Sequence, residues 1–166
     1  DEPKEHPLLR LTSIPGVGKA VTTFLIDSKM FLRLRMQRTL AKANHHLITE
    51  ERIESIRRPL FAADAHHSVL ATARNWHADR LEQDANLINQ PTLIIWGDQD
   101  TVIPIKHGYK MHEEILNSRF VILKDCGHVP QEEKSDLFVE LVTEFCHDRK
   151  GKIASTHDDT KLEQIM

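Results

Sequence analysis

Apolar residues recur at helical spacing over residues 20–88, and no run in that half of the chain is typical of a strand. The segment 20–43 predicts an amphipathic helix that is interrupted near Ser28. Thr49 is a suitable N-cap for a second helix, which we expect to end before Pro59. Further helices are expected over 64–76 and 78–88. We therefore predict that the first half of the chain is all-helical.

The pattern changes at Pro91 to short, continuously apolar runs that alternate with amphipathic segments. The expected elements are a strand over 92–96, a helix over 105–116, a strand over 119–123 and a helix over 131–147. Strands that are apolar throughout are buried on both faces, and a strand–helix–strand order joins them in parallel through a right-handed crossover. Residues 150–166 are polar and aperiodic, so we expect them to form a flexible tail.

The composition limits the partners of this chain. Its net charge of −3 and pI near 6.4, with basic residues that form no stripe, argue against a nucleic-acid surface. Hydrophobic residues make up 40% of the sequence, enough for a packed core, but no apolar stretch is long enough to span a membrane. The two cysteines, Cys126 and Cys146, are too few for a disulfide framework, and we expect both to be buried thiols. We therefore expect a cytoplasmic location, with any N-terminal signal lying upstream of Asp1.

Two short motifs carry the chemistry, and each follows one of the predicted strands. The first is Trp96-Gly97-Asp98-Gln99-Asp100, and the second is Gly127-His128-Val129-Pro130-Gln131-Glu132. The carboxyl ends of parallel strands meet at one edge of a sheet, so a carboxylate and an imidazole come together there. A carboxylate on one imidazole nitrogen fixes the tautomer, and the other nitrogen can then accept and return a proton. The motifs therefore supply two of the three groups of a nucleophile–His–acid triad.

Residues 91–145 resemble the C-terminal end of the α/β-hydrolase fold, through the pattern Pro-Thr-Leu-Ile-Ile-Trp-Gly-x-x-Asp and a later Gly-His-x-Pro-x-x-Glu. Residues 8–88 look like the helical cap that many members carry between the sixth and seventh strands. The resemblance implies an α/β fold in three parts. These are a helical cap or lid region over 1–88, the last parallel βαβα unit of the core over 89–149, and the flexible tail over 150–166.

Carried over to this sequence, the family pattern assigns the triad acid to Asp100 rather than Asp98, and the triad base to His128. No serine or cysteine among the 166 residues lies in the Gly-x-Ser-x-Gly frame of the nucleophile elbow. The N-terminal half of the sheet and the nucleophile elbow are thus absent from this sequence, and we expect them upstream of Asp1. The chain alone is then expected to be inactive.

The resemblance implies a hydrolase that cleaves an ester, a thioester or a carbon–carbon bond in a small apolar substrate, without a cofactor. Val129 stands where carbon–carbon bond hydrolases of the family often have Trp. An Asp nucleophile would instead imply an epoxide hydrolase or a haloalkane dehalogenase. The epoxide hydrolases usually use two cap tyrosines, whereas the single tyrosine here, Tyr109, lies outside the cap region. A different class also stays open, namely a truncated, non-catalytic remnant or binding module.

Other residues of the sequence carry weaker signals. Phe31 and Trp76 are candidate substrate contacts, because lids usually cover an apolar cleft, although the core of the cap could use the same residues. The pair Glu132-Glu133 is expected to start a helix and to interact with its N-terminus. The pairs His45-His46 and His66-His67 do not predict a metal site, because adjacent helical residues do not face each other and no ligand motif accompanies them. The sequence does not indicate an oligomeric state.

Overall fold

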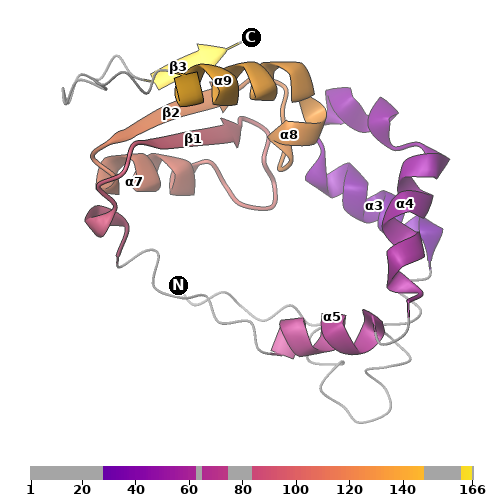
Figure 1. Cartoon of the computed structure of the whole chain (residues 1–166). Coiled ribbons are helices and arrows are strands. Elements are labelled where there is room, and N and C mark those ends of the chain that lie inside the picture. Colours follow the sequence, from indigo (N-terminus) through magenta and orange to yellow (C-terminus); the bar gives the residue numbers. More distant parts are fainter. Residues whose placement is uncertain (1–27, 63–64, 75–83, 148–161, 166) are drawn as a thin grey trace. The chain divides into compact units, whose positions relative to one another are not determined.

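The computed structural model describes residues 28–62, 65–74, 84–147 and 162–165 (Figure 1). The chain divides into two compact units, which differ from the predicted division at residue 88. The first unit combines Asp1–Met36 with Ile48–Ala78, and the second combines Gln37–Leu47 with Asp79–Met166. The segment 37–47, which lies within the predicted cap region, therefore packs with the part of the chain that carries both motifs.

The described part of the first unit is helical, as the apolar spacing predicts. Its helices are α3 (Lys29–Thr39), which continues into the second unit, α4 (Glu50–Leu60) and α5 (Ala65–Arg74). The Thr49 hydroxyl accepts a hydrogen bond of 3.1 Å from the amide of Arg52, which confirms Thr49 as the N-cap of α4. Pro59 lies inside the last turn of α4, so the prediction that this helix ends before it is wrong. A proline so close to the helix end disturbs only the final turn.

The helix α3 differs from the amphipathic helix that the sequence predicts over 20–43. It begins next to the expected break, and the Ser28 hydroxyl accepts a hydrogen bond of 3.2 Å from the amide of Phe31. No residue of α3 is buried, and Met30 and Leu34 are 74% and 52% exposed. The apolar residues are spread around the helix, so they form no single buried stripe. Residues 20–27 lie outside the described part of the chain.

Two further helical predictions fall partly outside the described residues. The helix expected over 64–76 is present as α5, but Asp64 and Trp76 are not described. Of the helix expected over 78–88, the described part contains only the short 3₁₀ helix η2 (Ala85–Leu87). None of the helices in the described ranges has the length and apolar character that crossing a bilayer requires.

The second unit is built on a parallel sheet with the strand order β1–β2–β3. The strands β1 (Thr92–Gly97) and β2 (Ser118–Leu123) pair in parallel, and α7 (Lys106–Glu114) connects them. These elements confirm the predicted strand–helix–strand unit. The strand β3 (Leu162–Ile165) pairs with β2, so this part of the expected flexible tail is a strand. The polar sequence did not indicate it, because strand pairing is made by backbone groups.

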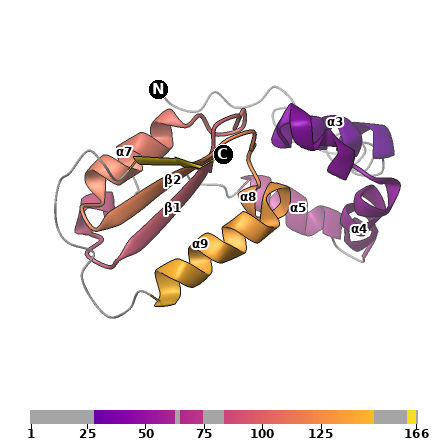
Figure 2. The same cartoon turned by 90° about the horizontal axis from the view of Figure 1, so that it is seen from above.

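Helices cover both faces of the sheet, as the continuously apolar strands predict (Figure 2). On one face, Val121 packs in a cluster with Leu141 of the C-terminal helix. On the other face, Phe120 packs in a cluster that includes Met111 of α7. Both strand residues are completely buried, so β2 lies in the middle of the core of this unit.

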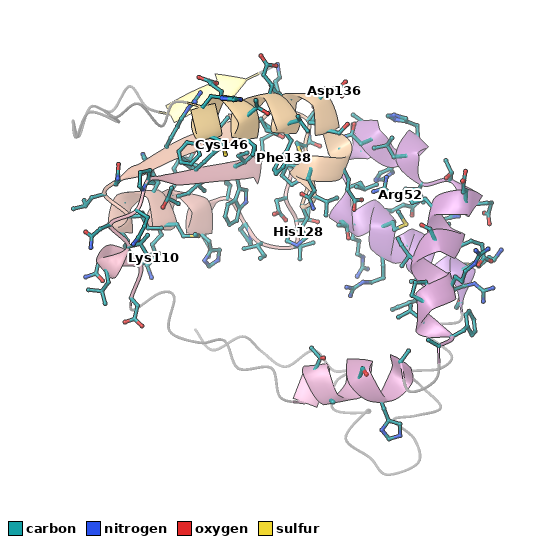
Figure 3. All side chains as sticks on the ribbon, viewed as in Figure 1. Arg52, Lys110, His128, Asp136, Phe138 and Cys146 are labelled. Carbon is teal, nitrogen blue, oxygen red and sulfur yellow. The ribbon has the colours of Figure 1, made fainter. Side chains whose placement is uncertain are left out.

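The helix predicted over 131–147 is divided in two. The short α8 (Pro130–Glu133) is followed by α9 (Ser135–His147), and Lys134 between them has φ −135° and ψ 49°, outside the helical range. Both cysteines are free, but only Cys126 is buried. The expectation that both are buried is wrong for Cys146, which is exposed near the end of α9 (Figure 3). It follows the buried Leu141 by five positions and therefore lies on the other side of the helix.

Candidate functional site

The two motif loops leave neighbouring strands and approach each other closely at their glycines. A Cβ atom on Gly97 would collide with the carbonyl oxygens of Cys126 and Gly127. A Cβ atom on Gly127 would collide with the carbonyl oxygen of Thr39 and lie 2.7 Å from the amide nitrogen of Ala41. Three backbone segments thus meet where only glycine leaves enough room.

Asp100 lies in the loop after β1, and both of its carboxylate oxygens have hydrogen-bond partners. Oδ1 accepts hydrogen bonds from the amides of Val102 and Ile103, at 2.8 and 2.9 Å. Oδ2 accepts a hydrogen bond of 2.9 Å from Nδ1 of His128. The side chain of Asp100 is only 5% exposed. The two backbone amides therefore hold the carboxylate in the orientation in which it meets the imidazole.

His128 lies in the loop after β2, on the side of the sheet where β1 and β2 end (Figure 3). Its amide donates a hydrogen bond of 2.8 Å to the carbonyl oxygen of Thr39, and its ring is 32% exposed. Because Nδ1 faces a carboxylate, Nδ1 carries the proton of the neutral ring, and Nε2 keeps its lone pair. Among the described residues, no hydrogen bond engages Nε2 of His128. This nitrogen is therefore available for proton transfer.

Asp98, the other acidic residue of the first motif, has a different partner. Its Oδ1 accepts a hydrogen bond of 3.2 Å from the amide of Cys126, and its own amide donates to the carbonyl oxygen of Leu123 at 3.0 Å. Asp98 therefore ties the first loop to the second. Of the two acids, the structure brings Asp100 to the imidazole, as the family pattern predicts.

The segment 37–47 bridges both loops, a role that the sequence does not predict. The hydroxyl of Thr101, next to the acid, donates a hydrogen bond of 2.7 Å to the carbonyl oxygen of Arg38. The Asn44 side-chain amide donates at 2.9 Å to the carbonyl oxygen of Asp125 in the second loop. The carbonyl oxygen of Thr39 also accepts the hydrogen bond from the amide of His128. These three contacts explain why the segment belongs to the second unit. No local feature of the sequence marks it.

Glu133 has a wider role than the expected contact with a helix N-terminus. The residue is 8% exposed, and its carboxylate accepts four hydrogen bonds. The donors are the amides of Gly127, Val129 and Ala41, at 2.8, 3.4 and 2.7 Å, and the side-chain amide of Asn44, at 2.8 Å. Two donors precede α8, as expected, but the other two belong to the segment 37–47. Glu133 is the final Glu of the pattern Gly-His-x-Pro-x-x-Glu, and this match was the only feature of the sequence that could have indicated its role.

Cys126, between the two motifs in space, is not a candidate nucleophile. Burial, and after it the negative charge of Glu133, raise the pKa of the Cys126 thiol to about 12. The thiolate is the nucleophilic form, so a thiol with this pKa is inert at neutral pH. Its buried side chain packs instead in the cluster of Val121 and Leu141.

An open pocket of about 450 Å³ lies beside the acid loop, wholly within the second unit. Its lining includes charged side chains of both signs, Arg38, Lys42, Asp98 and Asp100, together with the polar His45 and Thr101. The apolar residues Leu40 and Ala41 also line the pocket, so its wall is mixed, and His128 is not among its lining residues.

Three aromatic residues of the predicted cap region and the first motif have different outcomes. Phe31 is half-buried in α3, within the first unit, and Trp76 lies outside the described residues, so their assignment as substrate contacts stays a prediction. Trp96 packs against the core cluster of Phe120, and its indole N–H donates to the carbonyl oxygen of Ile103 at 3.2 Å. Trp96 thus connects the acid loop to the core of the second unit.

Comparison with known proteins identifies the family of this chain. A family model described as the alpha/beta hydrolase fold matches residues 13–135. An uncharacterized hydrolase of Bacillus subtilis (strain 168), YugF, is 29% identical over 99 residues, which are 60% of this chain and 36% of that protein. The 2-hydroxy-6-oxononadienedioate/2-hydroxy-6-oxononatrienedioate hydrolase of Klebsiella pneumoniae is 41% identical over 58 residues, which are 35% of this chain and 20% of that protein.

Among solved structures, the meta-cleavage product hydrolase CumD of Pseudomonas fluorescens IP01 superposes with a TM-score of 0.67 at 23% identity. The match covers 74% of this chain and 47% of that protein. At this level of identity the likeness shows the fold. In each of these three comparisons the chain spans less than half the length of the relative that it matches.

Proposed function

The chain belongs to the α/β-hydrolase fold family, and from this premise we propose that its Asp100 and His128 are the acid and the base of a nucleophile–His–Asp triad in a hydrolase. The hydrogen bond of 2.9 Å between Asp100 Oδ2 and His128 Nδ1 is the observation that carries the proposal. It connects the carboxylate with the ring nitrogen that is not needed for proton transfer.

In the proposed mechanism, Nε2 of His128 takes the proton of a nucleophile as that group attacks the substrate. The imidazolium is stabilised by the Asp100 carboxylate, and it then returns the proton to the leaving group. The nucleophile comes from a part of the protein upstream of Asp1, on a Gly-x-Ser-x-Gly elbow that this sequence does not contain. The short coverage of the relatives is consistent with that placement.

We propose an ester, a thioester or a carbon–carbon bond as the bond that is cleaved. The relative from Klebsiella pneumoniae, a hydrolase of 2-hydroxy-6-oxo dienedioates by its name, supports the carbon–carbon class. Val129 stands where that class often has Trp, so the support for the carbon–carbon class is modest. A small apolar substrate, the cap role of the first unit and a cytoplasmic location are also parts of this proposal.

The experiment uses the protein that carries this chain with its upstream sequence. Hydrolysis of a short-chain nitrophenyl ester and of a 2-hydroxy-6-oxo dienoate is measured for the wild type, for His128→Ala and for the control Asp136→Asn, an exposed change on α9. We expect His128→Ala to lower kcat by about 10⁴-fold or more, as removal of a triad base usually does, and the control to stay near the wild type.

Two results would argue against the proposal. Turnover by His128→Ala at the wild-type rate would remove His128 from the chemistry. No turnover by the wild type on either substrate, with an intact fold, would favour the non-catalytic alternative.

A further inference from the structure

The carboxylate of Glu133 is buried although it has no cationic partner among its hydrogen bonds. Its four donors are the amides of Gly127, Val129 and Ala41 and the side-chain amide of Asn44. A buried carboxylate is costly unless hydrogen bonds replace its water shell. Here they do so, and three of them attach different points of the backbone to one side chain.

These points of attachment surround His128. Gly127 and Val129 are its neighbours on either side, and both amides donate to Oε1 of Glu133. Oε2 of Glu133 accepts a hydrogen bond from the amide of Ala41. Two residues before Ala41, the carbonyl oxygen of Thr39 accepts the hydrogen bond from the amide of His128 itself. The backbone before, at and after the imidazole is therefore held either by Glu133 or by the segment that Glu133 binds.

The arrangement is more specific than stabilisation of a helix N-terminus. The helix α8 has only four residues, so its dipole is weak, and two of the four donors lie about ninety positions away in the sequence. The same segment also accepts the Thr101 hydroxyl next to Asp100, through the carbonyl oxygen of Arg38. Glu133 thus joins the imidazole loop to a segment that also holds the acid loop.

We propose that Glu133 is a positioning residue for His128: its carboxylate holds the 127–129 backbone so that Nδ1 stays within hydrogen-bond distance of Asp100. The inference rests on the proposed function in one respect, namely that the His128 imidazole is the base of the triad. A small rotation of the loop would lengthen the bond of 2.9 Å between Nδ1 and Oδ2, and the neutral ring would then no longer be confined to the Nδ1–H tautomer.

The test measures the tautomer of His128 directly and therefore does not depend on turnover. The ring nitrogens of the full-length protein are followed by ¹⁵N NMR at about pH 9, well above the ordinary histidine pKa of about 6.5, so that the ring is neutral. The signal of His128 is assigned by its loss in His128→Asn. The variants are Glu133→Gln, Asn44→Ala and two controls: Glu140→Gln, which removes a charge from an exposed position of α9, and Ile122→Ala, which loosens the core on the α7 face.

We expect the wild type to show the Nδ1–H form. Glu133→Gln places an NH₂ group against backbone amides, so the Nε2–H form should increase by about tenfold, an effect in the range of other residues that orient a functional histidine. Asn44→Ala should give a smaller increase. Ile122→Ala should lower the Tm and leave the tautomer unchanged, which separates positioning from general stability.

The proposal is overturned if folded Glu133→Gln keeps the wild-type tautomer. If Glu133→Gln does not fold, Asn44→Ala decides: a wild-type tautomer in that folded variant overturns the proposal, and a shift absent from both controls supports it. Because these readings need no substrate, they are distinguishable from a failure of the proposed hydrolase activity.

Discussion

Asp100 accepts the Nδ1–H of His128 at 2.9 Å, although the two residues are 28 positions apart in the sequence. The strands β1 and β2, which precede them, pair in parallel register, with Gly97 opposite Leu123. Because both loops start from the same edge of the sheet, the acid and the imidazole come together there, as the order of the elements predicts. Asp98, two positions earlier, instead binds the amide of Cys126.

Replacing Asp100 by Asn should remove the carboxylate that selects the tautomer of His128. In the full-length protein, we expect kcat to fall by about 10⁴-fold, as in other triads whose acid becomes an amide. Asp98→Asn is the matched control, because it leaves the bond to His128 in place and should change kcat far less. Steady-state kinetics on the substrate of the enzyme measures both. Equal losses in the two variants would mean that the loop, and not the Asp100 carboxylate, is what the chemistry needs.

The two cysteines should react very differently with iodoacetamide. The pKa of Cys126 is raised to about 12 by burial and then by Glu133, so almost no thiolate exists at pH 8, whereas Cys146 is exposed. We expect alkylation of the native protein to modify Cys146 and to leave Cys126 unmodified, as shown by peptide mass spectrometry. Both should be modified after denaturation. Rapid modification of native Cys126 would contradict its burial.

Gly127→Ala should destabilise the protein, because the added methyl group meets the carbonyl oxygen of Thr39 and the amide nitrogen of Ala41. Backbone atoms cannot yield as a flexible side chain can, so we expect a loss of about 3 kcal/mol in the free energy of unfolding. Chemical denaturation measures it, with Gln131→Ala, an exposed change in α8, as the control. A loss of less than about 0.5 kcal/mol in the free energy of unfolding, the usual size for surface changes, would show that the segment 37–47 is not in close contact with Gly127.

The ion pairs of Glu54 should make a small contribution to stability that depends on pH. Hydrogen bonds from Arg57 and then Lys29 lower the pKa of Glu54 from 4.5 to about 2. A folded-state pKa below the unfolded value stabilises the fold above about pH 4.5, and this contribution is lost as the pH falls toward 2. Because the group is exposed, the effect is small.

The measurement for Glu54 is the difference in Tm between the wild type and Glu54→Gln over this range of pH. We expect the wild type to melt at the higher temperature above pH 5 and the difference to vanish toward pH 2. Glu51→Gln, an exposed change in the same helix, is the control. A difference that is constant with pH would rule out the lowered pKa.

The elements of the second unit could be read from the sequence because their signals are local. Continuous apolar runs predict β1 and β2, and the loops after them contain the acid and the imidazole. The same local reasoning did not show that the final helix divides at Lys134, or that residues 162–165 add a strand to the sheet. The strand depends on its pairing with β2, which is distant along the chain.

The sequence by itself determined the parallel strand–helix–strand unit, the loops that follow its strands and the family to which the chain is similar, because the periodicity of apolar residues and the spacing of short motifs are local properties. The order of the elements also predicted that the acid and the imidazole meet at the ends of the strands. Only the tertiary structure decided that Glu133 binds the segment 37–47. Hydrogen bonds between segments some ninety residues apart form when the folded backbone brings donors and acceptors within about 3 Å, and no local pattern encodes that distance.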